Sequence, residues 1–96
     1  MFRVERTIEF ESWLDGLRDR SAQKRIAMRI RRVENGLLGD WKPVGEGVSE
    51  LRIDSGPGYR LYFTRRAQTI VILLCGSDKS GQDRAIALAR ELAGAV

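Results

Sequence analysis

The residues of this sequence best suited to chemistry are arginines on two neighbouring predicted β-strands. Arg52 and Arg60 fall in the segments 48–53 and 59–65, where apolar and polar side chains alternate with a period of two. Because the apolar positions of both segments must face the core, both arginines are expected on the opposite face of the sheet. A guanidinium binds two phosphate oxygens at once, so the pair suits an anionic ligand.

The turn between these strands is expected to bring the two arginines together. The connecting segment Asp54–Gly58 reads DSGPG, a dense turn signal. A hairpin that closes symmetrically about its central glycine sets Arg52 directly opposite Arg60. Like charges destabilise such a pair, so either Glu50 and solvent screen it or the pair holds an anion. A solvated sheet face, which is common in antiparallel sheets, is the alternative interpretation.

Glu50, Tyr62 and Lys79 complete the set of candidate catalytic residues. Glu50 and Tyr62 share the strand parity of the arginines, and Lys79 follows an apolar third segment, Thr69–Cys75. These cations would stabilise charge on the phosphate oxygens of a phosphorane-like transition state. RNA carries an internal nucleophile, the 2′-hydroxyl, so its cleavage needs in-line positioning, a proton acceptor and a proton donor, but no metal. Glu50 or Lys79 could accept the proton.

The composition limits which kinds of catalytic site, cofactor and partner this chain can have. The 96 residues are expected to form a single domain, residues 1–96, around one core. With no histidine and one cysteine, the chain cannot build a histidine-based triad or a zinc site, and no metal or other cofactor is expected. The net charge of +4 favours nucleic acid or an acidic protein as partner. The lone cysteine, the absence of an apolar leader and the short apolar runs favour a cytoplasmic protein without membrane contact.

The sequence predicts an α+β fold that would position these residues. A strand at Phe2–Glu5, expected to join a sheet edge, precedes a helix capped by Thr7, whose apolar stripe should be core: Phe10, Trp13, Leu14 and Leu17. Ser21 is expected to open a second helix, which ends near residue 35 and forms an αα-hairpin with the first. An irregular connection, residues 38–47, leads into a three-stranded antiparallel meander, and a C-terminal helix closes the chain.

The second helix is the most basic predicted element. Four cations on its exposed side are candidate RNA-binding residues: Lys24, Arg25, Arg29 and Arg32. The three arginines recur at i, i+4 and i+7, a row suited to phosphates. A solvated helix face is the alternative interpretation. Trp41, in the connection that follows, is expected to staple that segment onto the core.

Three motifs resemble a known family. They are Glu50-Leu51-Arg52, then Gly58-Tyr59-Arg60-Leu61-Tyr62-Phe63, then Leu73 to Asp83, which reads LLCGSDKSGQD. In this order of elements they resemble the RelE/ParE toxin superfamily and, within it, the HigB-like addiction module killer proteins, over nearly the whole chain. The resemblance implies a RelE-like, microbial-ribonuclease-like fold. It also implies a type II toxin encoded beside its antitoxin, typically a helix-turn-helix protein of the HigA type.

The resemblance further implies an activity. Family members that are enzymes cleave messenger RNA in the ribosomal A site by 2′-hydroxyl attack without a metal, so an mRNA endoribonuclease is expected. Arg52, Arg60 and Lys79 would then be the cationic catalytic groups, and the basic helix would face ribosomal RNA. Ala85–Val96 lacks the tyrosine or histidine that RelE enzymes often carry, and ParE relatives poison DNA gyrase. A gyrase inhibitor and a non-toxic antitoxin-binding remnant are therefore the alternatives.

Overall fold

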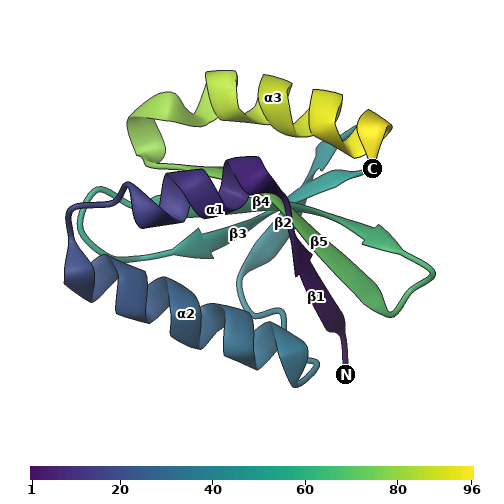
Figure 1. Ribbon diagram of the computed structural model, residues 1–96, viewed down its shortest axis with the longest axis horizontal. Helices are drawn as coiled ribbons and strands as arrows, with labels where there is room; N and C mark the ends of the chain where they lie inside the picture. The colour runs from purple at the N-terminus through teal and green to yellow at the C-terminus, as the bar shows by residue number, and fades with distance from the viewer.

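A five-stranded sheet forms the centre of the computed structural model, which describes residues 1–96 (Figure 1). In chain order the elements are β1 (Arg3–Arg6), α1 (Ile8–Asp15), α2 (Arg20–Glu34), β2 (Trp41–Gly45), β3 (Val48–Ile53), β4 (Tyr59–Arg66), β5 (Ile70–Ser77), the short 3₁₀ helix η1 (Lys79–Gly81) and α3 (Gln82–Ala95). The strand order is β1-β5-β4-β3-β2, with β1 parallel to β5 and the other neighbours antiparallel. The predicted α+β fold is confirmed. No helix is long and apolar enough to cross a membrane.

Helices cover both faces of the sheet, and α2 and α3 lie on opposite sides of it in Figure 1. The face under α1 and α2, called here the helix-pair face, carries a cluster of twelve buried residues that includes Phe10, Ile26 and Leu61. The opposite face, called the α3 face, carries a second cluster of seven buried residues that includes Tyr62 and Leu74. The expectation of one core was therefore wrong, because α3 packs on the face that the arginines occupy.

The N-terminal elements largely follow their sequence signals. β1 lies at the sheet edge beside β5, as expected. Thr7 caps α1, since its Oγ1 accepts a hydrogen bond of 3.0 Å from the amide of Phe10. The prediction that Ser21 caps α2 was wrong. Asp19 is the cap and accepts the amide of Ala22 at 3.1 Å, because a carboxylate there also interacts favourably with the positive end of the helix.

Residues 38–47, expected to be an irregular connection, contain the edge strand β2. This strand pairs with β3 through Trp41 opposite Leu51, and its register shifts between Pro43 and Gly45. Proline is tolerated there because the outer side of an edge strand has no hydrogen-bonding partner. Trp41 meets the expectation only in part: its ring centroid lies 6.2 Å from that of the buried Phe63, but the residue is 39% exposed.

The register of the meander decides which side chains meet on the α3 face. Arg52 lies opposite Arg60, as the symmetric hairpin predicted. Between β4 and β5 the pairing skips Leu74, which leaves one extra residue in β5 as a β-bulge. Beyond the bulge Ser77 pairs with Arg60. Without it, Gly76 would lie opposite Arg60, and Ser77 would point to the helix-pair face.

Candidate functional site

Two arginines of the α3 face lie around one buried carboxylate. Glu50 is 2% exposed, and its Oε2 lies 3.3 Å from Nε of Arg52 and 3.0 Å from Nε of Arg60. The two arginines thus share one counter-charge, which offsets their mutual repulsion. Arg60 is only 9% exposed, so the interpretation of this face as an ordinary solvated one was wrong. Two guanidiniums against one carboxylate leave an excess of positive charge. We call Glu50, Arg52, Arg60 and Lys79 the cationic cluster.

Arg60 has hydrogen-bonding capacity to spare. Its buried Nε lies close to the Glu50 carboxylate but makes no aligned hydrogen bond with it. Its Nη1 donates only a long bond of 3.4 Å to the carbonyl of Tyr59. Buried donors without partners cost free energy, and an anion with several acceptor oxygens would satisfy them. The buried guanidinium is therefore prepared for an anionic ligand.

Lys79, which follows β5, lies beside the turn between β3 and β4, at the same end of the sheet as the arginines. Gly58 has a φ of +78°, and a Cβ on it would lie 3.7 Å from Nη1 of Arg60 and 3.8 Å from Cβ of Lys79. A larger residue there would be strained by the positive φ, and its Cβ would be in van der Waals contact with both side chains. Lys79 itself is exposed in η1. The structure therefore brings together Glu50, Arg52, Arg60 and Lys79 from β3, β4 and the segment after β5.

Tyr62 occupies a different environment from the other candidates. Its side chain is fully buried, and its hydroxyl lies 3.2 Å from Oγ of Ser77. Burial raises the pKa of this phenol, and the hydrogen bond with Ser77 opposes the shift. A buried phenol of this kind suits positioning of its neighbours better than proton exchange with water. Ser77 was missed by sequence reasoning because only the β-bulge turns it toward Arg60.

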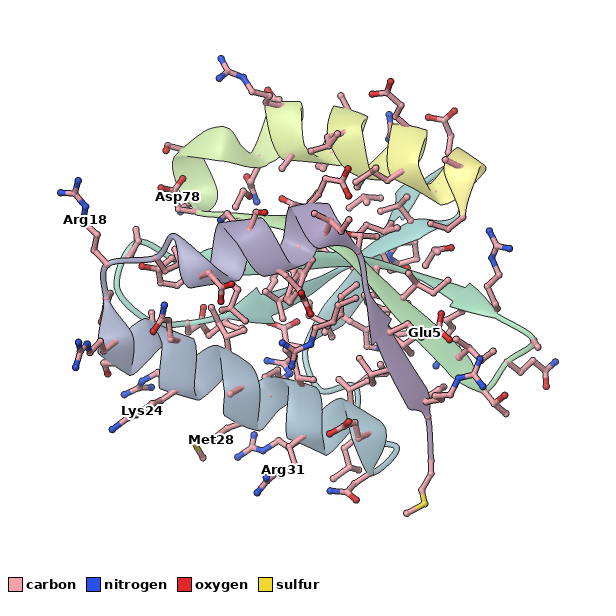
Figure 2. All side chains as sticks on the ribbon, viewed as in Figure 1. Glu5, Arg18, Lys24, Met28, Arg31 and Asp78 are labelled. Atoms are coloured by element: carbon pink, nitrogen blue, oxygen red, sulfur yellow. The ribbon has the colours of Figure 1, made fainter.

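The four candidate RNA-binding residues of α2 do not share one role in the structure. Lys24 points away from the sheet, as Figure 2 shows. Arg25 and Arg32 line a shallow groove of about 210 Å³ together with Met28, Arg29, Ile53 and Asp54. The groove adjoins the end of β3, the strand that carries Arg52.

Arg29 braces the fold instead of presenting free donors. Its guanidinium donates to the carbonyl of Leu38 at 3.2 and 3.0 Å, to that of Asp40 at 2.8 Å and to that of Arg52 at 2.7 Å. Burial lowers its pKa, and the nearby charge of Asp40 partly offsets this. Gly39 leaves room for the guanidinium, since a Cβ there would lie 2.8 Å from Nη2. Arg29 thus ties α2 to the backbone of the strand that carries Arg52.

A larger cavity of about 320 Å³ opens between the end of α1 and the start of α3. It is lined by Trp13, Gly76, Ser77, Asp78, Gly81, Arg84, Ala85 and Leu88. The indole of Trp13 rests on Gly76, where a Cβ would lie 2.3 Å from Cε3 of the ring. Trp13 packs against the core, as expected, and also forms one wall of this cavity.

Nucleophilic and metal chemistry find little support in the other side chains. Cys75 is 3% exposed, and its Sγ donates to the carbonyl of Ala85 at 3.4 Å. Burial raises the pKa of this thiol to about 11, which disfavours the reactive thiolate. No three acidic or cysteine side chains converge as a metal site would require. The chemistry that this arrangement supports is anion binding and electrostatic stabilisation.

Comparison with known proteins yields two matches. Residues 12–93 match the family model described as Phage derived protein Gp49-like (DUF891), a span that includes the whole cationic cluster. The chain is also 46% identical over 91 residues to an uncharacterized protein of Haemophilus influenzae, covering 95% of this chain and 92% of that protein.

Proposed function

The chain belongs to the phage-derived Gp49-like family, a family of RelE-like toxins from toxin–antitoxin pairs, and we propose that it is a HigB-like, ribosome-dependent mRNA endoribonuclease. An antitoxin partner follows from the family. The proposal adds that this partner is a HigA-like helix-turn-helix protein from an adjacent gene, that the ribosome presents the substrate, and that the toxin acts in the cytoplasm.

The cationic cluster carries the proposal. Arg52 and Arg60 would bind the non-bridging oxygens of the scissile phosphate, which satisfies the unused donors of Arg60. Binding would draw the guanidiniums from Glu50 and free its carboxylate to accept the 2′-hydroxyl proton. The 2′-oxygen then bonds to phosphorus while the bond to the 5′-oxygen breaks, giving a 2′,3′-cyclic phosphate. Lys79, which is exposed, would donate a proton to the departing 5′-oxygen.

The remaining candidates take supporting roles in this scheme. Tyr62 holds Ser77 opposite Arg60 and is a positioning residue. Lys24, Arg25 and Arg32 on α2 would contact phosphates of messenger or ribosomal RNA. Arg29, whose donors are largely committed to backbone carbonyls, would fix the distance between this basic surface and the cationic cluster.

Inducible expression tests the proposal. We expect growth arrest together with cuts inside translated codons, mapped by primer extension. Arg60→Ala should abolish both effects and still co-purify with the antitoxin. Arg66→Ala is the matched control, because Arg66 is exposed at the end of the same strand. Intact transcripts during growth arrest would contradict the nuclease proposal.

A gyrase-directed toxin of the ParE type is the second candidate. The observation in its favour is that the only carboxylate of the cationic cluster is buried in ion pairs, while α3 lacks tyrosine and histidine. This candidate predicts a DNA damage response and inhibited supercoiling with messenger RNA untouched. A non-toxic remnant, the third alternative, predicts unimpaired growth on induction.

A further inference from the structure

We propose that the cavity between α1 and α3 is a nucleobase pocket, which receives the base next to the phosphate held by the cationic cluster. The proposal deepens the proposed function and rests on its RNA substrate. The cavity is lined by an aromatic ring, small and aliphatic side chains, and a polar rim. Sequence-specific binding of single-stranded RNA uses the same combination: stacking on aromatic rings and hydrogen bonds to base edges.

Trp13 supplies a preorganised aromatic wall. One side of its indole is in direct contact with the backbone at Gly76, where three ring atoms lie 2.3 to 2.6 Å from the position of a Cβ. The ring of Tyr59 meets it nearly edge-on, at 6.2 Å between centroids and 66° between planes. These contacts fix the orientation of the indole before any ligand binds. A base would therefore meet a rigid aromatic surface and lose little binding free energy to side-chain ordering.

The polar rim offers one acceptor and one donor. Oδ1 of Asp78 accepts hydrogen bonds from the amides of Ser80 and Gly81 and the hydroxyl of Ser80, which lowers the pKa of this carboxyl. Its Oδ2 takes no part in these bonds. Arg84, also on the rim, makes no ion pair within the chain. Guanine fits such a rim best, because its edges carry amino and imino donors and the O6 and N7 acceptors that arginine binds.

Size and position also favour a base. The cavity, about 320 Å³, reaches the lower end of the range for small-molecule pockets, roughly 300 to 1,000 Å³, whereas the basic groove on α2 does not. Ser77 joins the cavity to the cationic cluster, since it lines the former and pairs with Arg60 in the sheet. Asp78, labelled in Figure 2 near the end of α1 and the start of α3, directly precedes Lys79. One nucleotide could thus place its phosphate on the cluster and its base in the cavity.

Fluorescence of Trp13 provides the test. Trp41→Phe leaves Trp13 as the only tryptophan of the full chain. The probes are 2′-O-methyl hexanucleotides, which cannot be cleaved, each with one guanosine among uridines on one side or the other of the central linkage. Matched probes carry an abasic site in place of the guanosine. We expect a guanosine probe to quench Trp13 and to bind roughly tenfold more tightly than its abasic match.

A substitution at the rim of the cavity tests the pocket without disturbing the buried core. Leu88 is 38% exposed on α3, so Leu88→Glu should fold and place a carboxylate in the cavity. It should remove the roughly tenfold advantage of the guanosine probe and leave binding of the abasic probe unchanged. Leu37→Glu, at a 63% exposed position away from the cavity, is the control and should change neither. Equal affinity of the guanosine and abasic probes, or binding of neither, overturns the base pocket. The RNA substrate is tested separately by the cuts in translated codons, so failure of the pocket and failure of the nuclease proposal are distinguishable.

Discussion

The two faces of the sheet bury different kinds of side chain. The twelve buried residues of the helix-pair face are all aliphatic or aromatic. Every buried polar or charged residue of the chain lies on the α3 face: Glu50, Arg60, Thr64 and Ser77. Desolvation of charge is costly, so such groups persist where they are paired or functional. The helix-pair face thus holds the fold together, and the α3 face holds the candidate site.

The difference arises from how much sheet each layer of helices can cover. α1 and α2 together span one face, whereas α3 alone packs on the other through small side chains, Ala85 and Ala89. Small residues let the helix lie close to Tyr62 and Cys75, and they leave the end of the sheet near the β3–β4 turn to the arginines. One face therefore combines a dry half with a charged half.

The largest effect is expected from truncation on the helix-pair face. Phe10 is fully buried, and Phe10→Ala should lower the free energy of unfolding by about 3 to 5 kcal/mol through lost burial and a new cavity. Ile8→Ala, at an 81% exposed position of the same helix, should change it by less than about 0.5 kcal/mol. Urea denaturation measures both. Similar values for the two variants would contradict the assignment of the core to this face.

On the α3 face we expect a substitution to lower the free energy of unfolding through electrostatics. Glu50→Gln leaves two neighbouring arginines without their shared counter-charge, and we expect a loss of about 3 kcal/mol. The double variant Glu50→Gln/Arg52→Gln also removes one of the two cations, so it should recover part of the lost stability. Inorganic phosphate should raise the melting temperature of the single variant more than that of the wild type, because the anion replaces the carboxylate. A melting temperature indifferent to phosphate would show that the cluster has no anion site.

The helix-pair face and the hairpin register were predictable from sequence because local rules decide both. A period of 3.6 identifies the stripe around Phe10, and strand parity with a glycine turn sets Arg52 opposite Arg60. The same rules could not show that α3 covers the arginines. Strand parity assigns side chains to the two faces of the sheet, but it does not show which face is exposed to solvent. Proline and glycines concealed β2, because an edge strand needs few of the residues that identify inner strands.

Other features depend on contacts between segments far apart in the sequence. Ser77 reaches Arg60 only through the β-bulge at Leu74, and no local pattern marks that residue. Arg29 looks like its neighbours Arg25 and Arg32 in the sequence. Its carbonyl partners come from the connection before β2 and from β3, so its structural role depends on tertiary packing.

Arg29 also provides a smaller test, of the brace between α2 and the sheet. Arg29→Met removes four donated hydrogen bonds, three of them partly buried, for an expected loss of about 2 to 3 kcal/mol in the free energy of unfolding. Arg25→Met, one turn earlier on the same helix and exposed, should change the free energy of unfolding by less than about 0.5 kcal/mol. Thermal denaturation of the pair measures the difference. Equal losses would mean that α2 is held by its apolar side chains alone.

The smallest expected effect probes the dry half of the α3 face through pH. Burial raises the pKa of Cys75 from 9.0 to about 11, so the folded protein retains a proton that the unfolded chain releases above pH 9. Stability from this thiol is therefore complete below pH 9 and is lost as pH rises toward 11, by about 2 kcal/mol. Tyr62, whose pKa is also raised, acts in the same direction, so the informative quantity is the difference between wild type and Cys75→Ala. The variant should lose less stability than the wild type between pH 8 and 11, and parallel pH profiles would mean that water reaches the thiol beneath α3.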